Sequence, residues 1–441
     1  MSIGVKSYLR RSVDLWPGSA NWTESLSAAP EYDTQDQCAR ERHLQDFLDL
    51  LSSEKSKERR TGEERRASQD RLLTGFDVFA ESALGFDKDQ VEALRLEDMA
   101  RISGQFASAA KRFDPCVSAE DVFQAMRNAW TMCYLQLLMG MPARLTPAIF
   151  AYSMLYPYSD NYLDDPDVNE SDKARFNWRM RARLMGKHVT PTDSRERVIY
   201  RLISKIEDQF PRTDHQQVFQ SLLAIHLAQE RSTRLLGPGA TTDPSEILRR
   251  SFEKGGCSVL ADGYLVAGQL TRAQAEFLFR LGTVLQLVDD LQDVGEDVEG
   301  GLMTVFSGLA AKALSRGGSS RSHAPRPICL DEVTTKLFGY AAEVSKGIVC
   351  FDSPDSVHLR EVTKLGIMLL LTLTAGSLEE LHSRSYVEAL EAHSPFRFGF
   401  LRQCRDKYAK QGLTRPSMVE VYAQLTSTDI PAPFEIESVS A

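Results

Sequence analysis

Apolar residues recur at the three- and four-residue spacing of α-helices along most of the chain. The pattern starts near Gln35, runs through residues 87–139, restarts at Pro147 and continues in several segments to about Gly412. The strict alternation of apolar and polar residues that marks β-strands is almost absent. The chain is therefore predicted to be all-α.

The same pattern predicts one large domain with loose ends. Residues 1–34 show no sustained period and are expected to form an irregular leader, whereas residues 35–425 are expected to form a single α-helical domain. Residues 315–327 are rich in Gly, Ser and Pro, which predicts a mobile loop. Residues 426–441 are expected to be a loose tail.

One predicted helix begins with a clear start signal. Thr146 supplies a capping hydroxyl and Pro147 fits the first helical position. Near the far end of this helix, Asp160 and Asp164 lie four residues apart and share one face. The helix is therefore expected to present a pair of carboxylates.

The face that carries these two aspartates continues backward through Tyr156, Ser153 and Ile149. An apolar and aromatic wall that leads to carboxylates suits a pocket with one charged end. Tyr156 and Ile149 are equally compatible with an ordinary helical core.

A second acidic run lies in residues 285–299, where Asp289, Asp293 and Asp297 follow the i, i+4, i+8 spacing of one helix face. Like charges at this spacing destabilise a helix by about 0.2–0.5 kcal/mol per pair. Asp290 follows Asp289 and is turned by about 100° around the helix, so it is expected to face a water ligand or solvent. The row favours a bound cation, and Mg²⁺ suits it because Mg²⁺ takes few carboxylates and keeps positions for water and phosphate. The alternative is a solvated acidic face.

Together the two acidic runs predict that two antiparallel helices face one another across a cavity. About two or three Mg²⁺ ions between them would hold a diphosphate and stabilise the charge of that leaving group. Further along, residues 247–268 carry small side chains that would allow close helix packing: Gly255, Gly256, Ser258, Ala261 and Gly263.

Composition narrows the class of protein. The formal net charge of −9 argues against general nucleic-acid binding. Seven cysteines are scattered without paired spacing, which favours reduced thiols and a cytoplasmic location. The longest strongly apolar stretch, residues 366–376, is too short for a transmembrane segment and reads as a core helix.

Two sequence motifs resemble those of a known superfamily. DNYLD at residues 160–164 and DDLQD at residues 289–293 resemble the two aspartate-rich motifs of class I isoprenoid synthases, which include terpene cyclases, prenyl diphosphate synthases and squalene and phytoene synthases. The segment from FEKGG at residue 252 to GLMTVF at residue 301 looks like the lysine-bearing helix, second motif and following segment of trans-prenyl diphosphate synthases. The resemblance implies a helical bundle around a central apolar cavity.

The resemblance also implies roles for individual residues. It makes Asp160, Asp164, Asp289 and Asp293 catalytic, and it implies Mg²⁺ ligands at those four positions and at Asp297. The residues expected to contact the substrate are Lys254, Arg231, Arg234, Tyr156, Ser153, Arg405 and Tyr408. Arg231 and Arg234 also fit an exposed helix face, and Lys254 also fits a surface position.

The leading functional expectation is a terpene synthase that ionises a linear prenyl diphosphate and cyclises or rearranges the cation. The alternative is a prenyltransferase that joins two isoprenoid units head-to-tail or head-to-head. By resemblance, Asn161 in place of a second aspartate and the lack of RRG and GKRxRP segments weaken the case for a head-to-tail chain elongator. A non-catalytic subunit that binds prenyl diphosphate is a third possibility. Dimerisation is common in the family, so a homodimer is also compatible.

Overall fold

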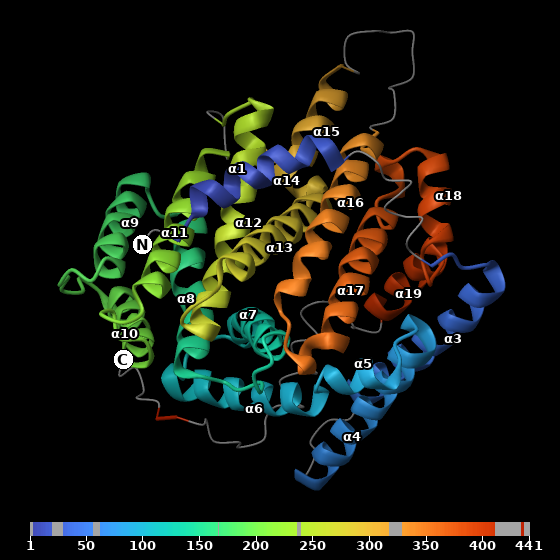
Figure 1. Ribbon diagram of the computed structural model, residues 1–441, viewed down its shortest axis with the longest axis horizontal. Helices are drawn as coiled ribbons and strands as arrows, with labels where there is room; N and C mark the ends of the chain where they lie inside the picture. Colours follow the sequence, from blue (N-terminus) through green and yellow to red (C-terminus); the bar gives the residue numbers. More distant parts are fainter. Residues whose placement is uncertain are drawn as a thin grey trace.

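The structure is a computed structural model that describes residues 3–19, 30–55, 62–165, 167–235, 240–316, 329–410 and 434–435. These residues form helices and connecting segments and contain no strand, which confirms the all-α prediction (Figure 1). The helices are α1 Val5–Leu15, α3 Thr34–Lys55, α4 Gly62–Phe79, α5 Lys88–Ala93, α6 Leu96–Phe113, α7 Ala119–Leu138, α8 Pro147–Asp164, α9 Glu170–Leu184, α10 Ser194–Gln209, α11 Gln216–Ser232, α12 Pro244–Ala267, α13 Arg272–Gln292, α14 Val294–Gly300, α15 Val305–Arg316, α16 Asp331–Lys346, α17 Val357–Gly376, α18 Arg384–Ala392 and α19 Phe398–Lys410.

Helices α12 and α13 form the most closely packed pair and lie in the middle of the molecule (Figure 1). A Cβ atom built on Gly255 of α12 would lie 2.4 Å from the carbonyl oxygen of Gly282 on α13, and one built on Gly282 would lie 2.1 Å from the carbonyl oxygen of Gly255. The two backbones therefore touch where both residues lack a side chain. This confirms the prediction that small residues on α12 allow close packing.

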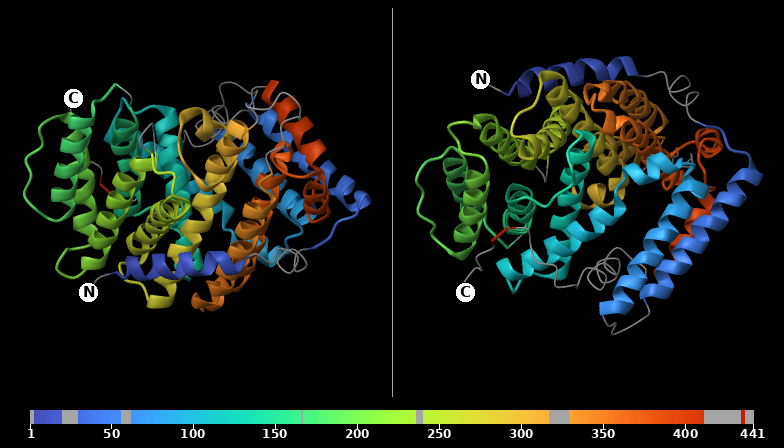
Figure 2. Two further views of the ribbon diagram at one scale, coloured as in Figure 1. Left: turned by 90° about the horizontal axis from the view of Figure 1, so that it is seen from above. Right: turned by 60° about the horizontal axis from the view of Figure 1, so that its bottom comes forward.

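The central pair connects the two halves of the molecule. Helix α12 packs against α11, α7 and α8, whereas α13 packs against α16 and α17. On the side of α17, helices α3 and α4 run side by side and project from the body (Figure 2). The stretch 366–376 lies in α17 and buries Ile367, Leu371 and Ala375, as expected for a core helix.

The leader is not irregular in the part that the structure describes. Residues 5–15 form α1, which packs across α12 and α13 and buries Tyr8 and Leu9. Its Arg11 Nε donates a 2.8 Å hydrogen bond to Glu276 Oε1 of α13. The expectation of an irregular leader was wrong, because Val5, Tyr8, Leu9 and Val13 recur at helical spacing in this short segment, although its N-cap is Gly4, at φ 75°, with no capping side chain. Burial against α12 and α13 stabilises α1, although no capping residue marks its start.

Two predicted segments fall mainly where the structure gives no description. Of the expected mobile loop at 315–327, residues 315 and 316 end α15, and the rest lie outside the described residues. Of the tail at 426–441, only residues 434–435 are described. Among the described helices, none is long and apolar enough to cross a membrane.

Candidate functional site

The first acidic motif lies at the end of α8, which starts as the sequence predicts. The N–H of Ile149 donates to Thr146 Oγ1 at 3.3 Å, and Pro147 occupies the first helical turn. Asp160 accepts hydrogen bonds from Ser159 Oγ at 3.0 Å and from Gln229 Nε2 of α11 at 3.2 Å. The carboxylate of Asp160 is therefore held against α11.

The wall behind Asp160 is only partly described. Ser153 and Ile149 are buried, and Ser153 Oγ accepts a 3.3 Å hydrogen bond from Asn128 Nδ2 of α7. The side chains of Tyr156 and Asp164 lie outside what the structure describes. Their predicted roles stay predictions.

The second acidic motif spans the junction of α13 and α14. Asp293 is the residue between the two helices, yet its N–H donates to the Asp289 carbonyl at 2.9 Å, and the Asp297 N–H donates to the Asp293 carbonyl at 2.9 Å. Helical spacing therefore persists through the junction. Asp289 is exposed, and Asp293 and Asp297 are half-buried.

The carboxylates of this motif repel one another. Burial is the largest cause that raises the pKa of Asp297 to about 7, and the negative charges of Asp290, Asp293 and Asp289 raise it further. The positive charge of Lys254 lowers it. A cluster of four carboxylates with one lysine beside it has the charge of a cation site.

Asp290 is not solvated as the sequence suggested. Its side chain is buried, its Oδ1 accepts a 2.8 Å hydrogen bond from Gln286 Nε2, and its Oδ2 has no hydrogen-bond partner among the described residues. Burial is the main cause that raises the pKa of Asp290 to about 6. The missed signal was local: Asp290 follows buried Leu287 by three residues and precedes buried Val294 by four.

Lys254 lies on α12 beside the second motif, where its charge lowers the pKa of both Asp290 and Asp297. The neighbouring Glu253 accepts from Arg231 of α11, with Nη1 to Oε1 at 2.5 Å. Arg231 therefore joins α11 to α12 near Lys254. The side chain of Arg234 lies outside the described residues.

The two predicted residues of α19 have different surroundings. Arg405 lines a cleft of about 570 Å³ with Gln292, the last residue of α13. The other lining residues are Leu373, Thr374, Ser377, Leu378, Glu380 and Arg402. Tyr408 is instead buried against α3, and its hydroxyl donates to Asp49 Oδ1 at 2.7 Å. This position gives Tyr408 a structural contact and leaves only Arg405 near the end of α13.

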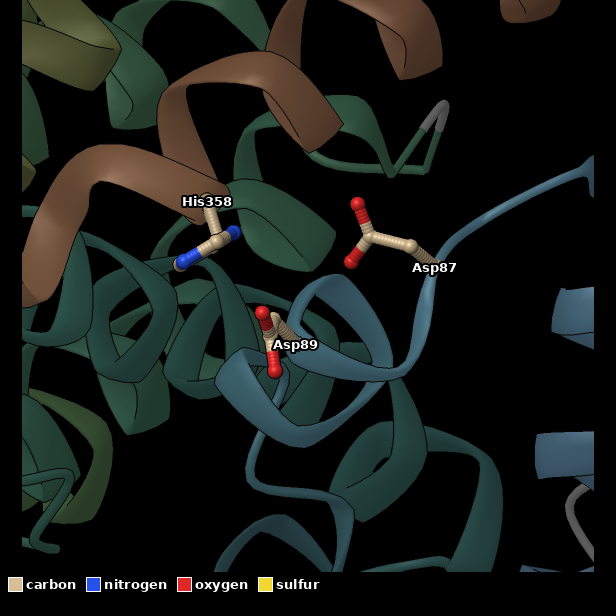
Figure 3. A group of neighbouring side chains, drawn as sticks. All are labelled: Asp87, Asp89 and His358. Carbon is tan, nitrogen blue, oxygen red and sulfur yellow. The ribbon is translucent and has the colours of Figure 1, made fainter.

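A separate group of possible metal ligands lies at Asp87, Asp89 and His358 (Figure 3). Their ligand atoms lie within 4.8 Å of one another, and in the described part of the chain the aspartates of the two motifs do not form such a compact trio. Asp87 is the N-cap of α5 and accepts the Gln90 N–H at 2.8 Å. Helix capping therefore accounts for the position of Asp87, and the group has no further feature that points to a metal.

The fold and the site define an all-helical protein in which α12, α13 and α14 gather four carboxylates and a lysine. Comparison of the chain with protein-family models, with curated proteins and with solved structures found no match.

Proposed function

We propose that this protein is a Mg²⁺-dependent class I isoprenoid synthase that ionises a linear prenyl diphosphate and cyclises or rearranges the resulting carbocation. The observation that carries the proposal is the repulsion that Asp289, Asp290 and Asp293 exert on Asp297, which the positive charge of Lys254 opposes. Carboxylate oxygens are the ligands that Mg²⁺ prefers, so this donor set fits the ion. The motif resemblance adds the substrate class.

In this proposal Asp289, Asp293 and Asp297 hold metal from one side, and Asp160 with Asp164 holds it from the other. Bound Mg²⁺ would supply Lewis-acid stabilisation of the departing diphosphate.

The chain's own residues orient these groups. Gln229 fixes Asp160 through a hydrogen bond. Lys254 adds a positive charge beside the carboxylates, where it would attract a diphosphate oxygen. Buried apolar side chains of α8 and α12, such as Ile149 and Leu260, would keep bulk water from the cation.

A prenyltransferase is the second candidate, and the cleft at the end of α13 favours it. Arg402 and Arg405 both line this cleft. A second diphosphate would bind these guanidinium groups in place of Glu379, which pairs with Arg402 at 2.9 Å, and beside Glu380, which also lines the cleft. An enzyme that joins two isoprenoid units needs two such sites, whereas a cyclase needs one.

Incubation with geranyl, farnesyl and geranylgeranyl diphosphate, each with and without isopentenyl diphosphate, tests both candidates. If the protein is a terpene synthase, we expect Mg²⁺-dependent diphosphate release and a cyclic or rearranged product without isopentenyl diphosphate. Product that forms only when isopentenyl diphosphate is present would favour the prenyltransferase.

Matched variants connect this activity to the site. Asp289→Asn and Asp293→Asn should each lower diphosphate release at least tenfold, whereas Asp208→Asn, at an exposed position of α10, should not. No release from any substrate by the wild-type protein would favour a non-catalytic subunit that binds prenyl diphosphate.

A further inference from the structure

A further buried carboxyl group, that of Asp262, lies on α12, eight residues after Lys254. Asp262 is 2 % exposed, and its Oδ1 has no hydrogen-bond partner among the described residues. An unpaired polar atom in a protein interior costs about 1–3 kcal/mol. Such atoms in native proteins commonly bind an ordered water or a polar group of a ligand.

The neighbours of Asp262 come from two other helices. Asn128 of α7 interacts with the Asp262 carboxyl group, and Tyr152 of α8 lies close enough to Asp262 for the charge to act on its phenol. Asn128 also donates to Ser153 Oγ at 3.3 Å. Helices α7, α8 and α12 pack together, so buried Asp262 and half-buried Asn128 and Tyr152 form one polar group between these helices.

The distance of this group from the acidic cluster is set by the helices. Asp262 follows Lys254 by eight residues in α12, and Tyr152 precedes Asp160 by eight residues in α8. At 1.5 Å per residue, both intervals correspond to about 12 Å along a helix axis. The negative charges of Asp262 and Asp160 both raise the pKa of Tyr152. The polar group therefore lies about 12 Å along these helices from the predicted ionisation site, a distance that a prenyl chain bound there by its diphosphate can span.

We propose that Asp262, Asn128 and Tyr152 hold a water molecule that captures the carbocation, so that the enzyme forms a terpene alcohol. This inference rests on the proposed isoprenoid synthase activity. An oxygen lone pair of the water forms the new carbon–oxygen bond, one O–H bond of the water breaks, and that proton passes to the Asp262 carboxylate. Asp262 is then the general base, and Asn128 and Tyr152 are positioning residues.

The surroundings suit both stages of this step. The step starts from ionised Asp262, which about half of the molecules hold at pH 8 before the substrate binds, so turnover in this test is measured at pH 8. Burial raises the pKa of Asp262 to about 8, so the protonated product of the transfer is favoured afterwards. Burial, followed by the charge of Asp262, also raises the pKa of Tyr152 well above 10, so its phenol keeps the proton with which it can orient water.

The test is turnover in H₂¹⁸O with the prenyl diphosphate that the wild-type protein accepts, followed by mass spectrometry of the products and measurement of released diphosphate. The wild-type product should carry one ¹⁸O atom. In Asp262→Leu, the ratio of labelled alcohol to released diphosphate should fall at least tenfold in favour of unlabelled hydrocarbon. Asp262→Asn keeps the shape but cannot accept the proton, and should shift the ratio in the same direction.

Thr372→Val is the matched control, because Thr372 is also buried and its hydroxyl donates to the Met368 carbonyl within α17. It should leave the ratio unchanged. Diphosphate release with only unlabelled hydrocarbon from the wild-type protein, or an unchanged ratio in both Asp262 variants, would overturn the water-capture role. Absence of diphosphate release by the wild-type protein would instead overturn the proposed function and, with it, this role.

Discussion

The positive charge of Lys254 on α12 acts on Asp297 of α14 and opposes three neighbouring carboxylates that raise the pKa of Asp297. The two residues are forty-three positions apart in the sequence, and the close contact of α12 with α13 brings them together. This pair links the central packing of the molecule to its candidate metal site.

Removal of the lysine charge should impair diphosphate binding. Lys254→Met keeps most of the apolar stem but removes the ammonium group. The expected loss in kcat/KM is about 10²-fold, as for other single donors to a developing anion. Steady-state diphosphate release measures it, with Lys364→Met on the exposed side of α17 as the control. Equal activity of both variants would remove Lys254 from the site.

Mg²⁺ should stabilise the folded protein even without substrate. An ion that binds the folded state at one hundred times its Kd adds about 2.7 kcal/mol to the free energy of unfolding. Thermal unfolding should therefore show a rise in Tm with MgCl₂ that a NaCl solution of equal ionic strength does not give. The rise should shrink in Asp293→Asn and persist in Asp208→Asn. A rise of the same size in both variants would contradict metal binding at the second motif.

A methyl group between α12 and α13 should destabilise the fold. A Cβ on Gly255 would meet the Gly282 carbonyl oxygen at 2.4 Å, and backbone atoms cannot move aside as a flexible side chain can. Gly255→Ala should lower the free energy of unfolding by about 1–3 kcal/mol. Urea denaturation measures the change.

Gly366→Ala in α17 provides the opposite control. No atom lies within 4 Å of a Cβ at this position, so the alanine should stabilise the helix by about 0.5–1 kcal/mol. A neutral Gly255→Ala would mean that α12 and α13 are not in backbone contact.

Buried Asp262 should make stability depend on pH. Burial raises its folded-state pKa from 3.8 to about 8, so the folded state holds a proton that the unfolded state releases between these values. Since the folded state binds more protons there, the contribution of Asp262 to stability falls as pH rises from about 4 to about 8. Asp262→Asn removes this loss.

Urea denaturation of the wild-type protein and of Asp262→Asn at pH 5 and pH 8 tests the sign. The variant should gain stability relative to the wild-type protein as pH rises. The quantity to follow is the free energy of unfolding of the variant minus that of the wild-type protein. If this value stays constant or falls from pH 5 to pH 8, burial does not keep Asp262 protonated.

The sequence by itself determined the helical class and several local features. Apolar residues recur with a period of about 3.6 residues and almost never alternate with polar ones, which predicts an all-α fold. Thr146 with Pro147 marks the start of α8. The spacing of Asp289, Asp293 and Asp297 survives the junction of α13 and α14 because the backbone hydrogen bonds continue through it. These features are local, so neighbouring residues suffice to predict them.

Tertiary structure decided which of these side chains meet and which are buried. Asp290 is buried because α12 covers its face of α13, Arg231 is paired with Glu253 of another helix, and Tyr408 turns to α3. Helix α1 forms without a side-chain cap because the α12–α13 surface buries its apolar face. Periodicity indicates which face of a helix is buried, but the residues that cover that face come from distant parts of the chain and leave no local signal in the sequence.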